Sequence, residues 1–281
     1  MDDADQQAIR DCDEAIRLKP QDANAYSNRG DVYRILGQYE RAIEDYDEAI
    51  RLNPQDANVY HARGATYYFL GQYERAMEDY NEALRLLPPD AGIYGDRAHA
   101  YIGLREHERA MEDFNESIRL NPQAIVYYDR GNHHRLLQQY ELAIRDYDEA
   151  IRLKPQDAKA YHYRGLSYRA LGQYERAFQD YDEAIRLQPQ YVEVYVNRGV
   201  AYTVLGQYER AIEDYDEAIG LNPQLADAYY NKGFALYQLG GHELAREEYE
   251  QAVRLNPQLG GEYYEEGLLA TGYLISPAGC S

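Results

Sequence analysis

The chain has 281 residues, and its 29 basic and 49 acidic residues give a formal net charge of −20 at neutral pH. Nucleic-acid binding depends on Lys and Arg contacts to phosphates, so this balance disfavours a DNA or RNA partner. No apolar run approaches the roughly 20 residues of a membrane-spanning helix, and two cysteines are too few for a disulfide framework. We therefore expect no nucleic-acid partner, no membrane insertion and, by default, a cytoplasmic location, with an extracellular filament left open.

Residues 1–22 predict a single helix. The apolar residues Ala8, Ile9, Cys12, Ala15 and Ile16 recur at three- and four-residue spacing, which places them on one helix face. Pro20 then ends the helix. The segment begins with several acidic residues, so it is not a signal peptide.

Residues 23–259 repeat one pattern. Prolines recur every 34 residues, except for one step of 33 between Pro122 and Pro155. They lie at positions 20, 54, 88, 122, 155, 189, 223 and 257. Self-similarity at this period predicts helical hairpins that bury their apolar faces only against their neighbours. The repeats are 23–56, 57–90, 91–123, 124–157, 158–191, 192–225 and 226–259.

The repeat resembles that of the tetratricopeptide repeat family over nearly the whole chain. Numbered from Ala23, its signature positions 4, 8, 11, 20, 24, 27 and 32 are Tyr26, Gly30, Tyr33, Ala42, Tyr46, Ala49 and Pro54. The resemblance implies an all-α, right-handed α-solenoid of seven helix-turn-helix repeats in one domain. It also implies a binding role, on an extended surface and without a cofactor.

The family's first helices line a concave groove, chiefly through positions 2, 5, 9, 12 and 13. In this chain the first helices vary from repeat to repeat, whereas the second helices are nearly identical. By this carry-over the partner groove contains His61, Tyr68, Tyr128, Arg135, His162, Tyr163, Arg169, Tyr230 and Tyr237. Position 5 holds no lysine, so the clamp with which some family members grip a chaperone's C-terminal carboxylate is not expected.

Position 7 departs from the family, where a large aliphatic residue is usual. It is basic in all seven repeats, and position 23 is acidic in step with it; Arg29 and Asp45 are the first such pair. A partly buried charge needs a partner, so this pattern predicts interhelical ion pairs. A ligand-binding arginine array is the alternative.

The histidines offer the only candidates for metal or catalytic chemistry. His107, His134 and His242 stand where sister repeats have tyrosine, which indicates packing, whereas His61 and His99 occupy groove positions. No metal-ligand spacing, phosphate-binding loop or nucleophile motif interrupts the repeat. We expect no enzymatic activity and no metal, with a site around His61 and His99 as a distant alternative.

Residues 260–281 complete the pattern as a first helix without its second, followed by a short tail. Its apolar residues complement the stripe of residues 1–22, so a head-to-tail contact between two chains would complete a repeat. The residues expected at these ends are Ile9, Cys12, Ile16, Tyr263, Leu268, Leu269, Tyr273, Leu274 and Ile275. An intermolecular disulfide between Cys12 and Cys280 stays open.

The sequence therefore favours a protein–protein interaction scaffold that self-assembles head to tail into a helical filament or tube. The alternative is a monomeric adaptor that holds an extended peptide in a tyrosine-lined groove.

Overall fold

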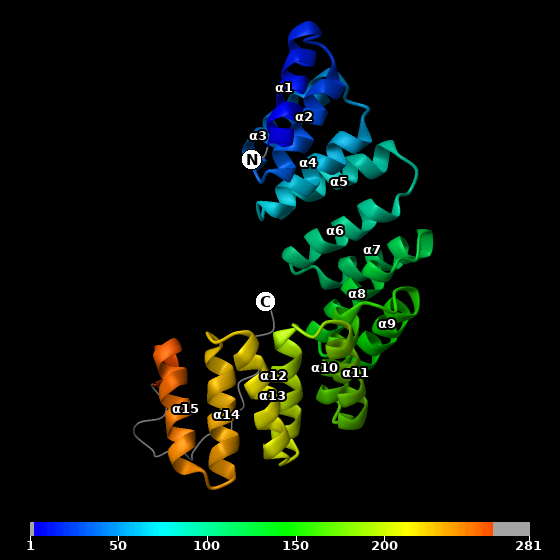
Figure 1. Cartoon of the computed structure of the whole chain (residues 1–281). Coiled ribbons are helices and arrows are strands. Elements are labelled where there is room, and N and C mark those ends of the chain that lie inside the picture. The colour runs from blue at the N-terminus through cyan, green and yellow to red at the C-terminus, as the bar shows by residue number, and fades with distance from the viewer. Residues whose placement is uncertain (1–2, 261–281) are drawn as a thin grey trace. The chain divides into compact units, whose positions relative to one another are not determined.

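The computed structural model describes residues 3–260, and within them the chain is helical with no strand (Figure 1). Fifteen α-helices and one short 3-10 helix are formed. The α-helices are α1 (Asp3–Leu18), α2 (Ala23–Ile35), α3 (Tyr39–Leu52), α4 (Ala57–Phe69), α5 (Tyr73–Leu86), α6 (Ala91–Gly103), α7 (His107–Leu120), α8 (Ala124–Leu136), α9 (Tyr140–Leu153), α10 (Ala158–Ala170), α11 (Tyr174–Leu187), α12 (Val192–Val204), α13 (Tyr208–Leu221), α14 (Ala226–Gln238) and α15 (His242–Leu255). The predicted all-α class of helix-turn-helix repeats is confirmed.

Two compact units make up the chain, one ending at Val126 and the other beginning at Tyr127, so the boundary falls within α8. In the first unit α2 packs on α3, α4 on α5 and α6 on α7. In the second unit α10 packs on α11, α12 on α13 and α14 on α15. Within each unit, second helices also pack on the first helix of the next repeat, as α3 does on α4 and α13 on α14.

Short-range chemistry sets the helix boundaries. Asp22, Asp56 and Asp157 each accept a hydrogen bond from the backbone N–H two residues later, which caps the following first helix. A tight turn then joins the two helices of a repeat, and Gly37 takes the left-handed conformation in it, with φ of 70°. Arg105 adopts nearly the same φ where the third repeat has no glycine.

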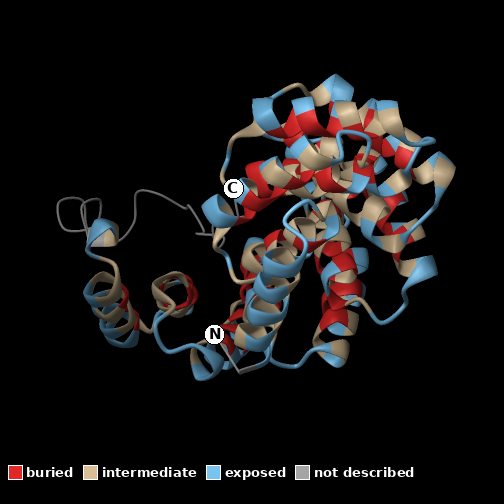
Figure 2. Ribbon diagram, turned by 90° about the horizontal axis from the view of Figure 1, so that it is seen from above, coloured by how far each residue is buried: buried red, intermediate tan, exposed pale blue. Residues whose placement is uncertain are grey.

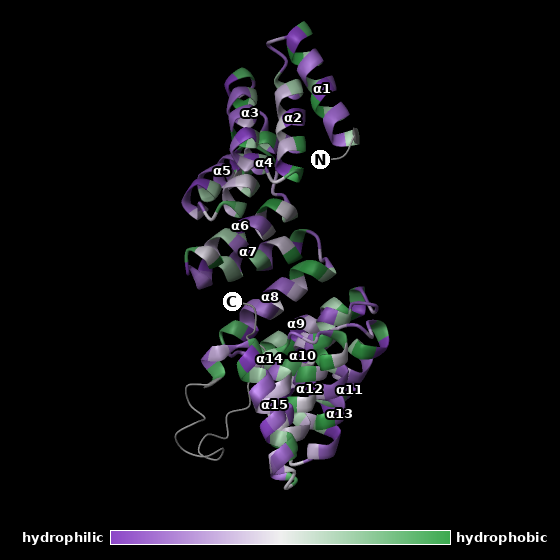
Figure 3. Cartoon of the chain, turned by 60° about the vertical axis from the view of Figure 1, so that its left-hand side comes forward, coloured by the Kyte–Doolittle hydropathy of each residue, from purple (hydrophilic) through white to green (hydrophobic). Residues whose placement is uncertain are grey.

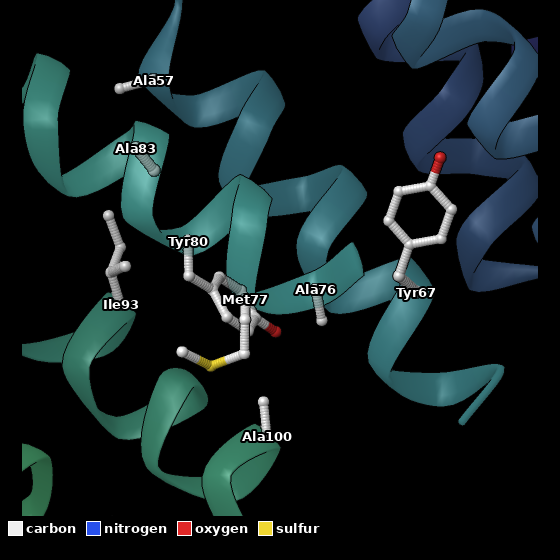
Figure 4. Close-up of a cluster of buried hydrophobic side chains, with 8 residues drawn as sticks. All are labelled: Ala57, Tyr67, Ala76, Met77, Tyr80, Ala83, Ile93 and Ala100. Carbon is white, nitrogen blue, oxygen red and sulfur yellow. The ribbon is translucent and has the colours of Figure 1, made fainter. Parts of the chain in front are cut away.

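The core lies between neighbouring helices, as the buried residues in Figure 2 show. The tyrosine at position 24 is its largest recurring member, and Tyr46, Tyr147 and Tyr181 have no exposed surface. The glycine at position 8 makes room for this ring, because a Cβ on Gly165 would lie 2.7 Å from Tyr181. Figure 4 shows one such cluster of the first unit, built by α4, α5 and α6 around Tyr80 and Ile93.

The predicted ion pairs between positions 7 and 23 are confirmed. Arg63 on α4 donates two hydrogen bonds, of 2.8 and 2.7 Å, to the carboxylate of Asp79 on α5. Asp79 is buried, and only 18% of the Arg63 side chain is exposed. The seven pairs are Arg29–Asp45, Arg63–Asp79, Arg97–Asp113, Arg130–Asp146, Arg164–Asp180, Arg198–Asp214 and Lys232–Glu248.

In six of these pairs the basic residue has a further partner on the preceding second helix, which the sequence did not predict. Arg63 also donates to Asp47 on α3 of the preceding repeat, at 2.5 Å. The corresponding contacts are Arg29–Asp13, Arg97–Asn81, Arg164–Asp148, Arg198–Asp182 and Lys232–Asp216. The basic residue therefore ties two successive second helices together, and we call the whole set the charge ladder.

We expect Asp79→Ala to lower the free energy of unfolding by about 3 kcal/mol, because it leaves the mostly buried Arg63 without its main counter-charge. Asp47→Asn is the matched control and should cost much less, because Asn81 fills the equivalent place beside Arg97. Urea unfolding followed by circular dichroism measures both. Equal losses in the two variants would contradict this ranking.

Candidate partner-binding site

All nine residues predicted for the partner groove lie on first helices. His61 and Tyr68 are on α4 of the first unit, and the remaining seven belong to the second unit. Those seven lie on three helices: Tyr128 and Arg135 on α8, His162, Tyr163 and Arg169 on α10, and Tyr230 and Tyr237 on α14. Second helices such as α15 are strongly hydrophilic on their outer side (Figure 3).

Four of these residues gather where α8 meets α10, and we call them the Tyr163 cluster: Tyr128, Arg135, His162 and Tyr163. The Tyr163 ring lies 5.7 Å from the Tyr128 ring and 5.1 Å from the His162 ring, between ring centroids. The Arg135 guanidinium lies over the Tyr163 ring at 5.1 Å, within range of a cation–π interaction. Tyr128, Arg135 and Tyr163 are half-buried, so they present both aromatic surface and positive charge to solvent.

His162 supports the cluster from beneath and is only 3% exposed. Its Nε2 accepts a hydrogen bond from the Asn197 amide at 3.0 Å, and its Nδ1 lies 3.0 Å from the Tyr191 hydroxyl. Because Nε2 accepts, the ring is neutral. Burial, reinforced by the charges of Arg135 and Arg169, lowers the pKa of His162 to about 3.

The two predicted groove residues of the first unit, His61 and Tyr68, both contact neighbouring side chains. His61 Nε2 lies 2.7 Å from a carboxylate oxygen of Asp96 on α6. The Tyr68 ring lies 5.7 Å from Tyr73 and 6.3 Å from His99. No group of three or more His, Cys, Asp or Glu residues in the described part of the chain is placed to hold a metal ion.

At α14 the structure separates two residues that the sequence analysis grouped. Tyr230 is 2% exposed, and its ring packs against Tyr249 at 5.3 Å, so it belongs to the core and offers no free surface. Tyr237 is half-buried and packs on His242 at 4.6 Å. His162 is buried in the same way as Tyr230, so its role in the site is to position Tyr163.

The predicted N-terminal end is partly described. Residues Ile9, Cys12 and Ile16 of α1 are half-buried. Ile43 and Ile50 of α3, which match Ile9 and Ile16, are half-buried as well, whereas Tyr46, which matches Cys12, is fully buried. Cys12 is a free thiol, and burial raises its pKa. The predicted C-terminal set Tyr263, Leu268, Leu269, Tyr273, Leu274 and Ile275, together with Cys280, lies outside the described residues.

Two features of the site escaped the sequence analysis. Tyr191 immediately precedes α12, and its hydroxyl lies 3.0 Å from His162 Nδ1, with 5.0 Å between the two ring centroids. Asn197 is buried at 3% exposure and completes the same network. The available signal was polarity at position 6, where an asparagine faces the histidine of the preceding repeat.

Other surface features give weaker candidates. An open cavity of about 450 Å³ in the first unit is lined by Asp47, Arg63 and Asp79, whose charges are already paired in the charge ladder. No helix among the described residues is long and apolar enough to cross a membrane.

Family models match this architecture along most of the chain. Models described as TPR repeat or Tetratricopeptide repeat cover residues 12–44, 30–71, 57–90, 91–123, 131–168, 165–206, 201–240 and 226–259. The chain belongs to the tetratricopeptide repeat family. No curated protein sequence matches it.

Several solved structures resemble it. A crystal structure of MamA is 25% identical with a TM-score of 0.54, over 60% of this chain and 92% of that one. The C-terminal part of a repeat protein from Cytophaga hutchinsonii has a TM-score of 0.69 at 16% identity, over 81% and 94%. The Cut9–Hcn1 structure of the APC/C scores 0.62 at 16% identity, over 89% of this chain and 46% of that one. At 16% identity, these last two likenesses establish the fold alone.

Neutral, buried His162 makes stability depend on pH. Its folded pKa of about 3 lies below the value of about 6.5 in an unfolded chain, so only the unfolded state gains a proton between these values. This contribution is fully present above pH 6.5 and is lost as the pH falls. Between pH 7.5 and 5.0 it should remove about 2 kcal/mol from the free energy of unfolding.

The check compares urea unfolding of the native chain and of His162→Gln at both pH values. Between pH 7.5 and 5.0 the free energy of unfolding should fall by about 2 kcal/mol less in the variant than in the native chain. An identical pH dependence in the two proteins would show that His162 takes up a proton in the folded state.

Proposed function

We propose that the chain is a non-enzymatic protein-interaction scaffold that binds an extended segment of a partner protein on the first-helix face of its second unit. One observation carries this proposal: the half-buried Tyr128, Arg135 and Tyr163 form a joined aromatic and cationic surface. Tyrosine and arginine are the residue types that dominate binding energy at protein interfaces. They combine a large apolar area with polar groups that reach solvent.

The repeat architecture supports the same role. The second helices are nearly identical in sequence and are held by the charge ladder, so they provide a common framework. Variation is confined mainly to first helices, where a partner would be distinguished. The tetratricopeptide repeat fold is typically a non-enzymatic scaffold, which agrees with this division.

The proposal is tested with peptides selected from a displayed random library on the purified chain. We expect Tyr128→Ala and Tyr163→Ala each to reduce the binding free energy of the selected peptides by about 2 kcal/mol, as measured by fluorescence anisotropy. Glu141→Ala and Glu175→Ala, on exposed positions of second helices, are the controls and should leave affinity unchanged. Equal losses from both sets of variants would place the binding surface elsewhere. Tyr230→Ala is unsuitable because the buried ring supports folding.

A second candidate function is head-to-tail assembly, favoured by the incomplete cover of α1. Its residues Ala8, Cys12 and Ala15 are half-buried, whereas the matching residues of α3, Ala42, Tyr46 and Ala49, are fully buried. Residues 263–275 supply a complementary apolar sequence, so the occupant we propose is the C-terminal segment of a second copy. A contact of this kind does not close on itself unless its rotation permits, and so produces a filament.

Assembly should strengthen with salt, because added ions screen repulsion between chains that each carry −20 charges. Light scattering on the intact chain, with and without added salt, gives the size distribution. Ile9→Asp and removal of residues 261–281 should each return the chain to a monomer, whereas Glu40→Gln on exposed surface should not. A native chain that stays monomeric at high concentration, with and without added salt, would leave only the groove-binding role.

A further inference from the structure

Three repeats carry an arginine at position 12 of the first helix: Arg34, Arg135 and Arg169. Each acts on the buried tyrosine at position 24 of its own repeat. Arg34 and Arg135 lower the pKa of Tyr46 and Tyr147 by hydrogen bonding and charge, against the larger effect of burial. Arg169 acts on Tyr181 through its charge. The same two groups therefore meet in repeats one, four and five.

In the first repeat a carboxylate of the chain itself completes this pair. Asp31, at position 9, accepts a hydrogen bond of 2.8 Å from the Tyr46 hydroxyl. The same oxygen lies 3.8 Å from Arg34 Nη2. One internal carboxylate thus satisfies the hydroxyl and balances the arginine.

Repeats four and five lack that carboxylate. Position 9 is Asn132 in repeat four, where it accepts from the Tyr147 hydroxyl at 2.8 Å but brings no charge. It is Leu166 in repeat five, where the Tyr181 hydroxyl is buried and has no hydrogen-bond partner. Within the described part of the chain, neither Arg135 nor Arg169 has a carboxylate at ion-pair distance, whereas Arg34 has Asp31. The buried Nε atoms of Arg34 and Arg135 both lack a hydrogen-bond partner.

Arg135 contacts the Tyr163 ring, and the charge of Arg169 acts on His162 beside it. The Arg135 guanidinium reaches from α8 across to Tyr163 on α10, whose ring lies 5.1 Å from His162. Arg169 follows His162 by seven residues and so lies on the same face of α10. Both charges act on His162, whose pKa each of them lowers. An uncompensated positive patch therefore stands on a chain whose net charge is −20.

We propose that Arg135 and Arg169 form a subsite for the side-chain carboxylates of an acidic, extended segment of the partner protein. The ligand replaces, from outside, the carboxylate that Asp31 provides internally in the first repeat. The Tyr181 hydroxyl lies beneath this subsite, and Leu166 packs against its cluster, so the ligand contacts the arginines and Tyr163. The inference rests on the proposed function and adds the chemistry of the partner.

The test uses short, capped, fluorescein-labelled peptides of Asp, Ala and Tyr, with a matched peptide that carries Asn in place of Asp. The native chain should bind the Asp peptide more tightly, and Arg135→Gln or Arg169→Gln should each weaken it roughly tenfold. Arg34→Gln is the matched control and should leave the affinity for the Asp peptide unchanged, because Asp31 already lies at ion-pair distance from Arg34. Added salt should lower the affinity for the Asp peptide and leave the affinity for the Asn peptide unchanged.

Leu166→Asp restores the internal carboxylate at position 9. It should weaken binding of the Asp peptide about as much as Arg169→Gln does and raise the thermal midpoint, because Arg169 and the Tyr181 hydroxyl gain a partner. If this variant fails to fold, the double variant Arg135→Gln/Arg169→Gln decides the question, with circular dichroism to confirm that it keeps its helical fold. A third peptide, with Asn residues and a free C-terminal carboxylate, separates side-chain recognition from recognition of a chain end.

Equal affinity of the native chain for the Asp and Asn peptides would overturn the subsite, as would unchanged Asp-peptide affinity in the double variant. Preference for the free chain end alone would overturn it too. The proposed function fails differently: selected peptides would then be indifferent to Tyr128→Ala and Tyr163→Ala. If the tyrosine substitutions weaken peptide binding but the native chain binds the Asp and Asn peptides equally, the proposed function holds and the acidic subsite does not exist.

Discussion

The structure depends on one interaction, the bridge that a basic residue at position 7 makes between two second helices. A guanidinium held in a largely buried place is costly unless carboxylates surround it. Arg164 meets this condition with Asp180 of its own repeat and Asp148 of the preceding one, both at 2.6 Å. In five of the seven repeats the basic residue also takes an acid from the second helix that precedes it, so those rungs are electrostatically complete only with that helix in place.

Helix α1 meets this requirement for the first complete repeat. The first complete repeat places Arg29 between Asp45 and Asp13, and Asp13 belongs to α1. Helix α1 thus supplies the acid that the first rung needs. The same helix leaves Cys12 half-buried where the matching Tyr46 of α3 is fully buried, so α1 completes the ladder electrostatically and is itself less covered than α3.

The periodic sequence predicted the helices, their turns and the own-repeat pairs of the ladder, because each depends on residues at fixed spacing. It did not reveal that Asp47 would join Arg63, since the aspartates of second helices looked like solvent-exposed charge. It also placed His162 and Tyr230 on the groove by family position, whereas both are buried. Their burial depends on particular neighbours, Tyr191 for one and Tyr249 for the other, which an average position does not specify.

Uniform repeats cannot by themselves distinguish one partner from another, so selectivity has to come from the places where a repeat departs from its sisters. Position 9 is such a place. An aspartate there neutralises the neighbouring arginine in the first repeat, and a leucine leaves the arginine of the fifth repeat without a carboxylate. A single side chain that contacts no partner therefore decides whether a repeat is electrostatically closed or open. In a chain of −20 charge, the open repeats are the ones that can favour an acidic partner over the repulsion of everything around them.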